Sequence, residues 1–319
     1  MKQGGLVENL VSGSNEVSFQ SKGIKIVGVL YLPEDFDATK TYEGIVMTPP
    51  FPQVKDQVLG NYGPEMAARG YTALAFDYNS KGESDSYDPK FRNDDDFPRK
   101  WEDLRNAISF LGSLSFVGPI NGLAFCGGGN IMSSVLISDL RVKAFASVSA
   151  MLATDMINFT DMDAYKAKIK KANEARQQMF ETGEPISADY FGYTDPNYLE
   201  KNAEASEITK EGYDYYGTKR GGTETYPNYT NVLLSNVNES TVLNLGEHYA
   251  AKLLQPYCGI VGSRAETAIC TKVFYDQVTS EKEFHEIDGA SHLDLYDVPE
   301  NMSKVADIVD AFYKKHREL

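Results

Sequence analysis

Short apolar runs rich in β-branched residues alternate along this chain with segments of helical periodicity, and this alternation constrains the fold most strongly. Before the series begins, two runs that alternate with period two predict an antiparallel hairpin. The hairpin runs are 17–20 and 24–32, the other strand-like runs are 44–48, 72–76, 120–125, 142–148, 257–261 and 283–287, and the helical segments are 57–69, 99–114, 129–140, 265–278 and 300–314. Strands alternating with helices predict an α/β fold, with a mostly parallel sheet covered by helices on both faces.

The alternation stops midway through the chain and later resumes. The intervening stretch contains a charged helical segment at 165–180 and then a polar, tyrosine-rich segment without an obvious buried strand. An insertion between two strands of one sheet is expected to cover the strands' carboxyl ends, the edge where open α/β sheets bind ligands. We therefore predict a core formed by residues 1–150 and 246–319, and a helical cap or lid formed by residues 151–245.

A run of small residues joins a predicted strand directly to a predicted helix, in Ala124-Phe-Cys-Gly-Gly-Gly129. In a nucleophile elbow the reactive residue occupies a strained turn, and its neighbours two before, two after and three after must be small. Ala124, Gly128 and Gly129 satisfy this requirement around Cys126, and a helix N-terminus favours a thiolate. A phosphate loop would need Gly-Lys-Ser/Thr, and a dinucleotide fingerprint would need glycine where Met132 stands. A buried structural cysteine is the remaining alternative.

A base and an acid for this nucleophile follow from the positions of loops in such a fold. His292 lies in a small-residue loop between the last strand and the last helix, a loop expected to face the elbow. Glu266 follows the preceding strand and gives the order nucleophile, acid, histidine. Its role would be to orient the imidazole and stabilise the imidazolium. Asp155, after an earlier strand, is the alternative acid, and a carboxylate favoured by the helix dipole is the alternative reading of Glu266.

Oxyanion stabilisation and substrate binding are assigned by the same reasoning. The N–H group of Gly127, directly after the nucleophile, is one expected donor to an oxyanion. The loop after the 44–48 strand is rich in proline, which has no N–H, so Phe51 is the second expected donor. From the cap, we expect Tyr190, Tyr215 and Tyr216 to line an apolar or aromatic substrate pocket.

The chain resembles the α/β-hydrolase superfamily, within the dienelactone-hydrolase and peptidase S15-like group, and is most similar to the bacterial YcjY-like hydrolases. The resemblance covers nearly the whole chain and rests on the Cys126 elbow and on Val54-Lys-Asp-Gln57, Phe76-Asp-Tyr-Asn-Ser-Lys-Gly-Glu-Ser84, Tyr215-Tyr-Gly-Thr-Lys-Arg-Gly221, Val261-Gly-Ser-Arg-Ala-Glu-Thr267 and Asp288-Gly-Ala-Ser-His-Leu-Asp-Leu-Tyr296. The group usually has Asp where this chain has Glu266. It also usually has a His-Pro-Gly-type oxyanion loop where this chain has Pro-Pro-Phe.

Composition narrows the partners of the chain. A formal net charge of -15 opposes binding to nucleic acid and to anionic membranes, which leaves a small-molecule substrate. Three sparse cysteines and no CxxC pair predict neither a disulfide framework nor a zinc site, and we expect no cofactor. The acidic run at 94–96 is expected to be solvated. The first nine residues lack the apolar core of a secretory signal, so a cytoplasmic protein is expected, with homodimerisation left open.

These features predict a hydrolase that cleaves an ester, lactone or thioester through an acyl-enzyme on Cys126. A lyase, cyclase or isomerase that uses the same cysteine and histidine is the first alternative. A catalytically silent binding protein of the same fold is the second, because one fold hosts many chemistries.

Overall fold

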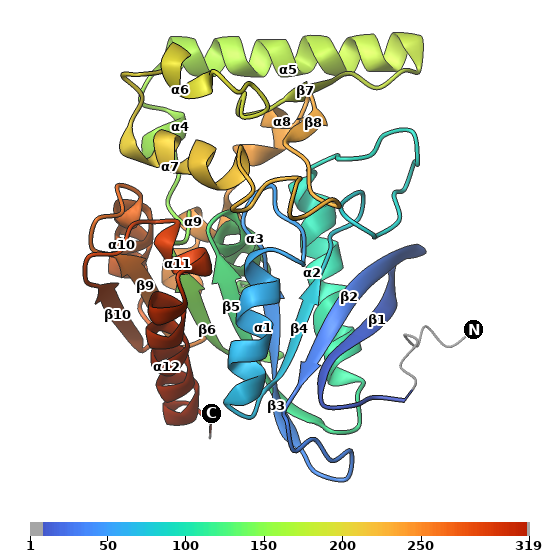
Figure 1. The fold of residues 1–319 in the computed structure, drawn as a ribbon, viewed down its shortest axis with the longest axis vertical. Coiled ribbons are helices and arrows are strands. Elements are labelled where there is room, and N and C mark those ends of the chain that lie inside the picture. The colour runs from blue at the N-terminus through green and yellow to red at the C-terminus, as the bar shows by residue number, and fades with distance from the viewer. Residues whose placement is uncertain (1–8, 318–319) are drawn as a thin grey trace.

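The computed structural model describes residues 9–317, so the expected absence of a secretory signal at residues 1–8 lies outside the described part. An eight-stranded sheet with the order β1-β2-β4-β3-β5-β6-β9-β10 forms the centre of the molecule (Figure 1). The pairs β1–β2 and β2–β4 are antiparallel, and every other neighbouring pair is parallel. The strands are β1 Gly13–Ser21, β2 Ile24–Leu32, β3 Tyr42–Thr48, β4 Thr72–Phe76, β5 Val117–Phe125, β6 Val142–Val148, β9 Tyr257–Gly262 and β10 Lys282–Ile287.

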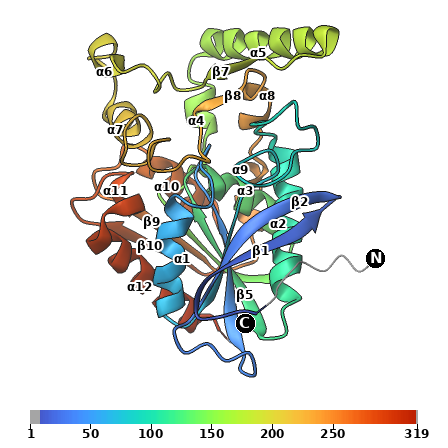
Figure 2. The ribbon, with the colours of Figure 1, turned by 45° about the vertical axis from the view of Figure 1, so that its right-hand side comes forward.

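Helices cover both faces of this sheet (Figures 1 and 2). The apolar side of α1 Val58–Ala68 and that of α12 Pro299–Lys315 belong to one buried cluster, which includes Tyr62 and Phe312. On the opposite face, a second cluster includes residues of α2 Phe97–Gly112, α3 Gly127–Leu136 and α10 Ala268–Gln277. The predicted α/β fold with a mostly parallel sheet is confirmed.

Complete burial explains why the central strands are readable in the sequence. All five residues of β4 are buried, so the strand has no polar face and is a continuous apolar run. The carboxyl ends of the parallel strands meet at one edge of the sheet. The loops that follow β3, β5, β9 and β10 therefore converge there, and these loops contain the predicted site residues.

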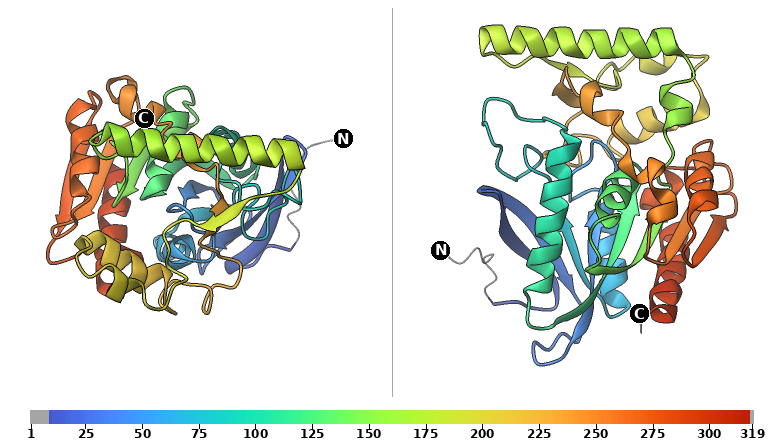
Figure 3. Two further views of the ribbon diagram at one scale, coloured as in Figure 1. Left: turned by 90° about the horizontal axis from the view of Figure 1, so that it is seen from above. Right: turned by 180° about the vertical axis from the view of Figure 1, so that it is seen from behind.

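Residues 151–245 are arranged over that edge, as Figures 1 and 3 show. The long helix α5 Met162–Thr182 begins at Asp161, whose side chain accepts hydrogen bonds from two backbone N–H groups, and ends at Gly183 in the left-handed region. The other elements of this segment are α4 Asp155–Asn158, β7 Ser187–Asp189, α6 Tyr198–Lys201, α7 Glu207–Tyr216, β8 Val232–Leu234 and α8 Asn238–Thr241. The chain returns to the sheet through α9 Leu245–His248 and the 3-10 turn Ala250–Lys252.

Three short elements differ from the expectation. β7 and β8 pair antiparallel, and two of the three β8 residues are buried, although no buried strand was predicted in this segment. A one-turn helix, α11 Asp294–Asp297, precedes α12. Within residues 9–317, no helix combines the length and the apolar character needed to cross a bilayer.

Candidate active site

Cys126 occupies a sharp turn between β5 and α3. Its backbone φ is 46°, a left-handed conformation that is costly for a residue with a side chain. Three hydrogen bonds hold the turn: the Cys126 N–H donates to Val148 at 3.1 Å, and its carbonyl accepts from Gly129 and from Met151, both at 2.9 Å. The surrounding backbone therefore fixes a strained conformation that turns the side chain toward the carboxyl edge of the sheet.

The glycines after Cys126 are required by close approach of other backbone segments. A Cβ atom at Gly128 would lie 2.5 Å from the carbonyl oxygen of Thr48 and 2.6 Å from that of Pro49. At Gly129 a Cβ atom would lie 2.7 Å from the Cβ atom of Ala150. These distances are below any normal contact, so the turn cannot form with larger residues at these two positions.

The N–H groups of Gly127 and Phe51 converge on the Cys126 thiol. Hydrogen bonds from both groups act to lower the pKa of the thiol. The two residues lie side by side, since a Cβ atom at Gly127 would be 3.2 Å from the Phe51 nitrogen. The other candidate donor in the loop, the Gln53 N–H group, is occupied by the carbonyl of Pro50 at 2.7 Å. The geometry thus offers two donors to a developing oxyanion beside the sulfur.

The loop that contains Phe51 is anchored at both ends of its turn. The Lys55 N–H donates to the buried carboxylate of Asp77 at 2.7 Å, and the Lys55 ammonium lies 3.3 Å from the same carboxylate. The Gln53 amide donates to the Tyr216 hydroxyl at 3.0 Å, which connects the loop to α7 above it. These contacts hold the Phe51 N–H group without help from a ligand.

The protonation state of Cys126 differs from the sequence expectation. Its position at a helix N-terminus suggested a favoured thiolate, but burial outweighs the hydrogen bonds and raises the thiol pKa above its ordinary value. The resting thiol is therefore neutral. A base would have to remove its proton before the sulfur could act as a nucleophile.

His292 is buried with 3% of its surface exposed, in the loop between β10 and α11. Its Nδ1 atom is hydrogen-bonded to the Thr267 hydroxyl, and its Nε2 atom lies 2.8 Å from the Tyr296 hydroxyl. Its carbonyl accepts from the Ser149 hydroxyl at 3.1 Å. Burial lowers the pKa of this imidazole from 6.5 to about 4, so His292 is neutral at physiological pH.

The structure does not bring either predicted acid to His292. Glu266 is exposed, and its carboxylate accepts from the Ile208 N–H at 3.4 Å. Asp155 faces His248 instead, with 3.7 Å between its carboxylate and Nε2. The position next to Nδ1, where a triad acid would stand, is occupied by the hydroxyl of Thr267.

A cavity of about 360 Å³ opens onto the thiol and the imidazole. Tyr190 and Tyr216 line it, but Tyr215 does not: it is fully buried and packs edge-on against the ring of Tyr296 at 5.6 Å. The remaining wall is mostly apolar, and among residues 9–317 no Asp, Glu, Lys or Arg belongs to it. Its apolar members are Phe51, Phe97, Met151, Ile157, Phe191, Tyr193, Ile208 and Leu293.

Comparisons with known proteins show similarity in sequence and in fold. No protein-family model matches the chain. The uncharacterized protein YcjY of Escherichia coli is 26% identical, over 95% of this chain and 99% of that protein. The crystal structure of the hypothetical protein PA2218 from Pseudomonas aeruginosa superposes with a TM-score of 0.80 at 24% identity, covering 98% of this chain and 96% of that one. The α/β hydrolase GrgF from Penicillium sp. sh18 superposes with a TM-score of 0.75 at 19% identity, covering 96% and 99%.

This chain has the α/β-hydrolase fold. The loops after β5, β9 and β10 contain Cys126, Thr267 and His292, respectively. This is the chain order that the fold gives to a nucleophile, an orienting residue and a base.

Sequence reasoning missed two residues of this site, Thr267 and Tyr296. Thr267 follows the predicted acid directly, so the correct loop was identified but the wrong side chain within it. Tyr296 stands four residues after His292, on the one-turn helix α11 that begins at Asp294. An element of this length shows no helical period in the sequence, so no signal pointed to Tyr296.

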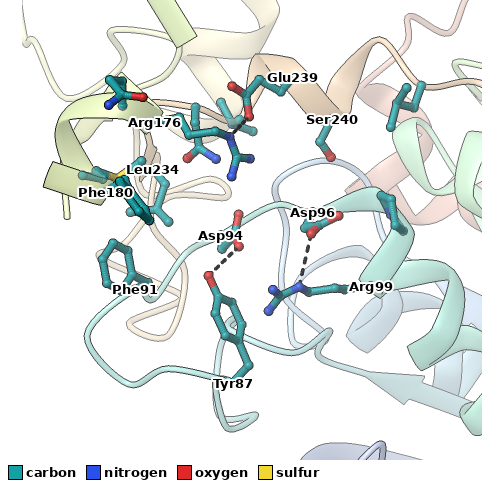
Figure 4. Close-up of a pocket in the computed structure, with 16 residues that line it drawn as sticks. Tyr87, Phe91, Asp94, Asp96, Arg99, Arg176, Phe180, Leu234, Glu239 and Ser240 are labelled. Carbon is teal, nitrogen blue, oxygen red and sulfur yellow. Dashed lines mark hydrogen bonds and ion pairs between the residues drawn. The ribbon is translucent and has the colours of Figure 1, made fainter. Parts of the chain in front are cut away.

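A second cavity of about 670 Å³ lies between α5, α8 and the loop before α2, away from the elbow (Figure 4). It is larger than the first, but its charged side chains largely satisfy one another. Arg176 pairs with Glu239 at 2.5 Å, and Arg99 pairs with Asp96 at 3.1 Å. Neither Cys126 nor His292 lines this second cavity. The thiol and the imidazole line the smaller cavity instead.

The acidic run Asp94–Asp96 was expected to be solvated, and this prediction is wrong for Asp95. Asp95 is fully buried, where it pairs with Lys100 and, at 2.6 Å, with Lys81. A buried carboxylate between two ammonium groups needs no solvent. Among residues 9–317, no group of three or more His, Cys, Asp or Glu side chains is arranged to hold a metal ion.

We expect the low pKa of His292 to determine how kcat/KM and the stability of the protein depend on pH. A base that protonates only near pH 4 keeps kcat/KM on its plateau well below pH 6.5. The unfolded imidazole protonates first, so this group's contribution to stability is complete above pH 6.5 and is lost as pH falls toward 4. A pH profile of kcat/KM and melting curves of wild type and His292→Gln measure both effects. An acid limb centred near pH 6.5 would contradict the burial argument.

Proposed function

We propose that the protein is a hydrolase that cleaves neutral esters, lactones or thioesters through an acyl-enzyme on Cys126. The observation that carries this proposal is the position of the thiol: it sits on a strained elbow, faces two backbone N–H donors and opens into an apolar cavity. A φ of 46° is costly, and a cysteine with only a structural role would gain nothing from it beside two such donors. The cysteine elbow also supports a place in the dienelactone-hydrolase-like group.

Each part of the site has a step in the proposed reaction. His292 receives the thiol proton, and the Cys126 sulfur attacks the substrate carbonyl carbon. The N–H groups of Gly127 and Phe51 hold the oxyanion that forms. His292 then returns the proton to the leaving group, and water releases the acyl group from sulfur with the imidazole again acting as base.

The cavity wall supports a neutral, apolar or aromatic acyl group as the substrate. No charged side chain lines the cavity, and His292 is neutral, so a carboxylate or an ammonium group would lose its hydration without gaining a partner. Aromatic side chains of residues 151–245, among them Tyr190, Phe191 and Tyr216, form one side of the cavity. We therefore propose that this segment is a cap that closes over the acyl group and selects it.

A second function, acyl transfer to an acceptor other than water, is favoured by the hydroxyl at His292 Nδ1. A carboxylate in that place would stabilise the imidazolium, whereas Thr267 cannot supply a charge. An imidazole that is so weak a base removes a proton from an acidic carbon or a phenol more readily than it removes one from water. Cyclisation, in which a hydroxyl or amine of the same substrate takes the acyl group, is the intramolecular form of this transfer. Lyase and isomerase reactions would use the same cysteine and histidine without an acyl acceptor.

A panel of aryl esters and thioesters in matched neutral, carboxylate-bearing and ammonium-bearing forms tests the proposal. We expect the neutral members to be turned over with a kcat/KM on the order of 100-fold higher, because a charge stranded in an apolar wall costs about 2–3 kcal/mol or more. Product analysis with and without an added phenol then separates hydrolysis from transfer. Equal turnover of the charged members would contradict the assigned substrate class, and turnover of none would favour a binding protein.

A further inference from the structure

The hydroxyl of Tyr296 is close to both the His292 imidazole and the Cys126 thiol. It is 2.8 Å from His292 Nε2, and its hydrogen bonding acts on the thiol of Cys126. Cys126, His292 and Tyr296 line the same cavity, and within the described part of the chain no direct hydrogen bond joins Cys126 to His292. The Tyr296 hydroxyl is thus the side-chain group that interacts with both the thiol and the imidazole.

The position of this hydroxyl is fixed from several sides. Tyr296 is fully buried on α11, and Asn61 and Tyr62 of α1 hold that helix by donating to the carbonyls of Tyr296 at 2.9 Å and Leu295 at 2.7 Å. The ring packs edge-on against Tyr215. A fully buried tyrosine held in this way has little freedom to leave the line between thiol and imidazole.

We propose that Tyr296 is a further catalytic residue, whose hydroxyl passes the proton of Cys126 to His292. This inference rests on the proposed function. The S–H bond breaks as the proton joins the tyrosine oxygen, while the original O–H proton moves to Nε2. The electron pair stays on sulfur, so the products are a thiolate, a neutral tyrosine and an imidazolium.

Two features of the site fit this transfer. For Nε2 to accept a proton, Nδ1 must carry a hydrogen, and the Thr267 hydroxyl is in place to accept a hydrogen bond from it. Burial and the neighbouring Cys126 hold the pKa of Tyr296 well above its usual value. A lasting tyrosinate is therefore unfavourable, and the two protons move together.

The variant Tyr296→Phe removes the hydroxyl and keeps the ring. We expect kcat/KM to fall on the order of 100-fold or more, as for the loss of a general acid–base group, with little change in Tm. The solvent isotope effect in H₂O/D₂O mixtures should change from a curved dependence, with two protons in motion, to a linear one. Without any substrate, the pH midpoint for iodoacetamide alkylation of Cys126 should rise, because a hydrogen bond that lowers the thiol pKa is lost.

Tyr313→Phe is the matched control. Tyr313 is another buried tyrosine, whose hydroxyl donates to the Gly122 carbonyl at 2.7 Å, far from the cavity. Its loss should lower Tm but leave kcat/KM and the alkylation midpoint unchanged. If Tyr296→Phe folds poorly, 3-fluorotyrosine at position 296 keeps the hydroxyl and makes it more acidic, and an unshifted alkylation midpoint in that protein would contradict the relay.

The outcomes separate the relay from the proposed function. Wild-type kcat/KM in Tyr296→Phe, together with an inactive Cys126→Ala, would overturn the relay and leave the acyl-enzyme intact. Full activity in Cys126→Ala would overturn both. A loss of activity in Tyr296→Phe without a change in the isotope effect or in the alkylation midpoint would make Tyr296 a structural residue and also overturn the relay.

Discussion

Replacing Cys126 by alanine is expected to abolish turnover while Tm stays nearly unchanged. The variant keeps a small side chain in the elbow and removes only the sulfur, so no backbone contact of the turn is lost. Without the nucleophile, the remaining donors and base offer only a small acceleration over the reaction in water. Steady-state assays with neutral aryl thioesters and thermal melting check both parts.

The variant Cys126→Ser shows whether the site is adapted to sulfur. A hydroxyl depends wholly on the base for its proton, and the burial that holds the pKa of His292 near 4 makes it a weak base. We therefore expect Cys126→Ser to lose most of its activity and to accumulate slowly hydrolysed acyl-enzyme. Activity in Cys126→Ser equal to that of the parent would indicate a site with no preference for sulfur.

Replacing Gly128 by alanine is expected to cause a large loss of stability. The new Cβ atom would lie 2.5 and 2.6 Å from two backbone carbonyl oxygens, which cannot rotate away as a side chain can. Relief requires β3 and α3 to separate, at a cost on the order of 3 kcal/mol or more. Chemical denaturation measures this loss, and we expect activity to fall with it because the oxyanion donors move.

Gly112→Ala is the control for this substitution. A Cβ atom there would meet only Ile120 Cδ1 at 3.4 Å, an ordinary contact, at the end of α2. We expect a change within about 0.5 kcal/mol, since alanine is the better helix former. A Gly128→Ala protein as stable as Gly112→Ala would show that strand and helix are not in close contact at the elbow.

The core of this fold could be predicted because its signals are local. The five residues of β4 were predicted from end to end, since a strand buried on both faces is an uninterrupted apolar run. The pair β7 and β8 gave no such signal: each strand has three residues, and 42 residues separate Asp189 from Val232. Such a pairing depends on contacts made in the folded chain, and a strand of three residues is too short to show a period in the sequence.

The elbow was equally local, but the environment of His292 was not. Glu266 and Thr267 are neighbours, and which of them faces the imidazole depends on where α10 begins. The predicted helix started at residue 265, whereas α10 starts at Ala268, so Thr267 stands just before the helix with its hydroxyl on His292 and Glu266 stays in the exposed loop. Tyr296 stands on a helix of one turn, too short to show a helical period in the sequence.

Burial also reversed one electrostatic expectation. A helix N-terminus stabilises a thiolate, and that argument is available from sequence. The opposing cost of removing charge from water depends on how completely residues 151–245 and the loops of the sheet edge enclose the thiol, which only the folded structure shows.

Intact-protein mass spectrometry of the rapidly quenched reaction is the most direct test for an acyl-enzyme on Cys126. With a neutral aryl thioester in excess, the account predicts a mass increase of one acyl group per chain, located by peptide mapping on Cys126. The adduct should be absent from Cys126→Ala and should accumulate in Cys126→Ser. Turnover without any acyl adduct, or an adduct on another residue that persists in an active Cys126→Ala protein, would contradict the acyl-enzyme on Cys126.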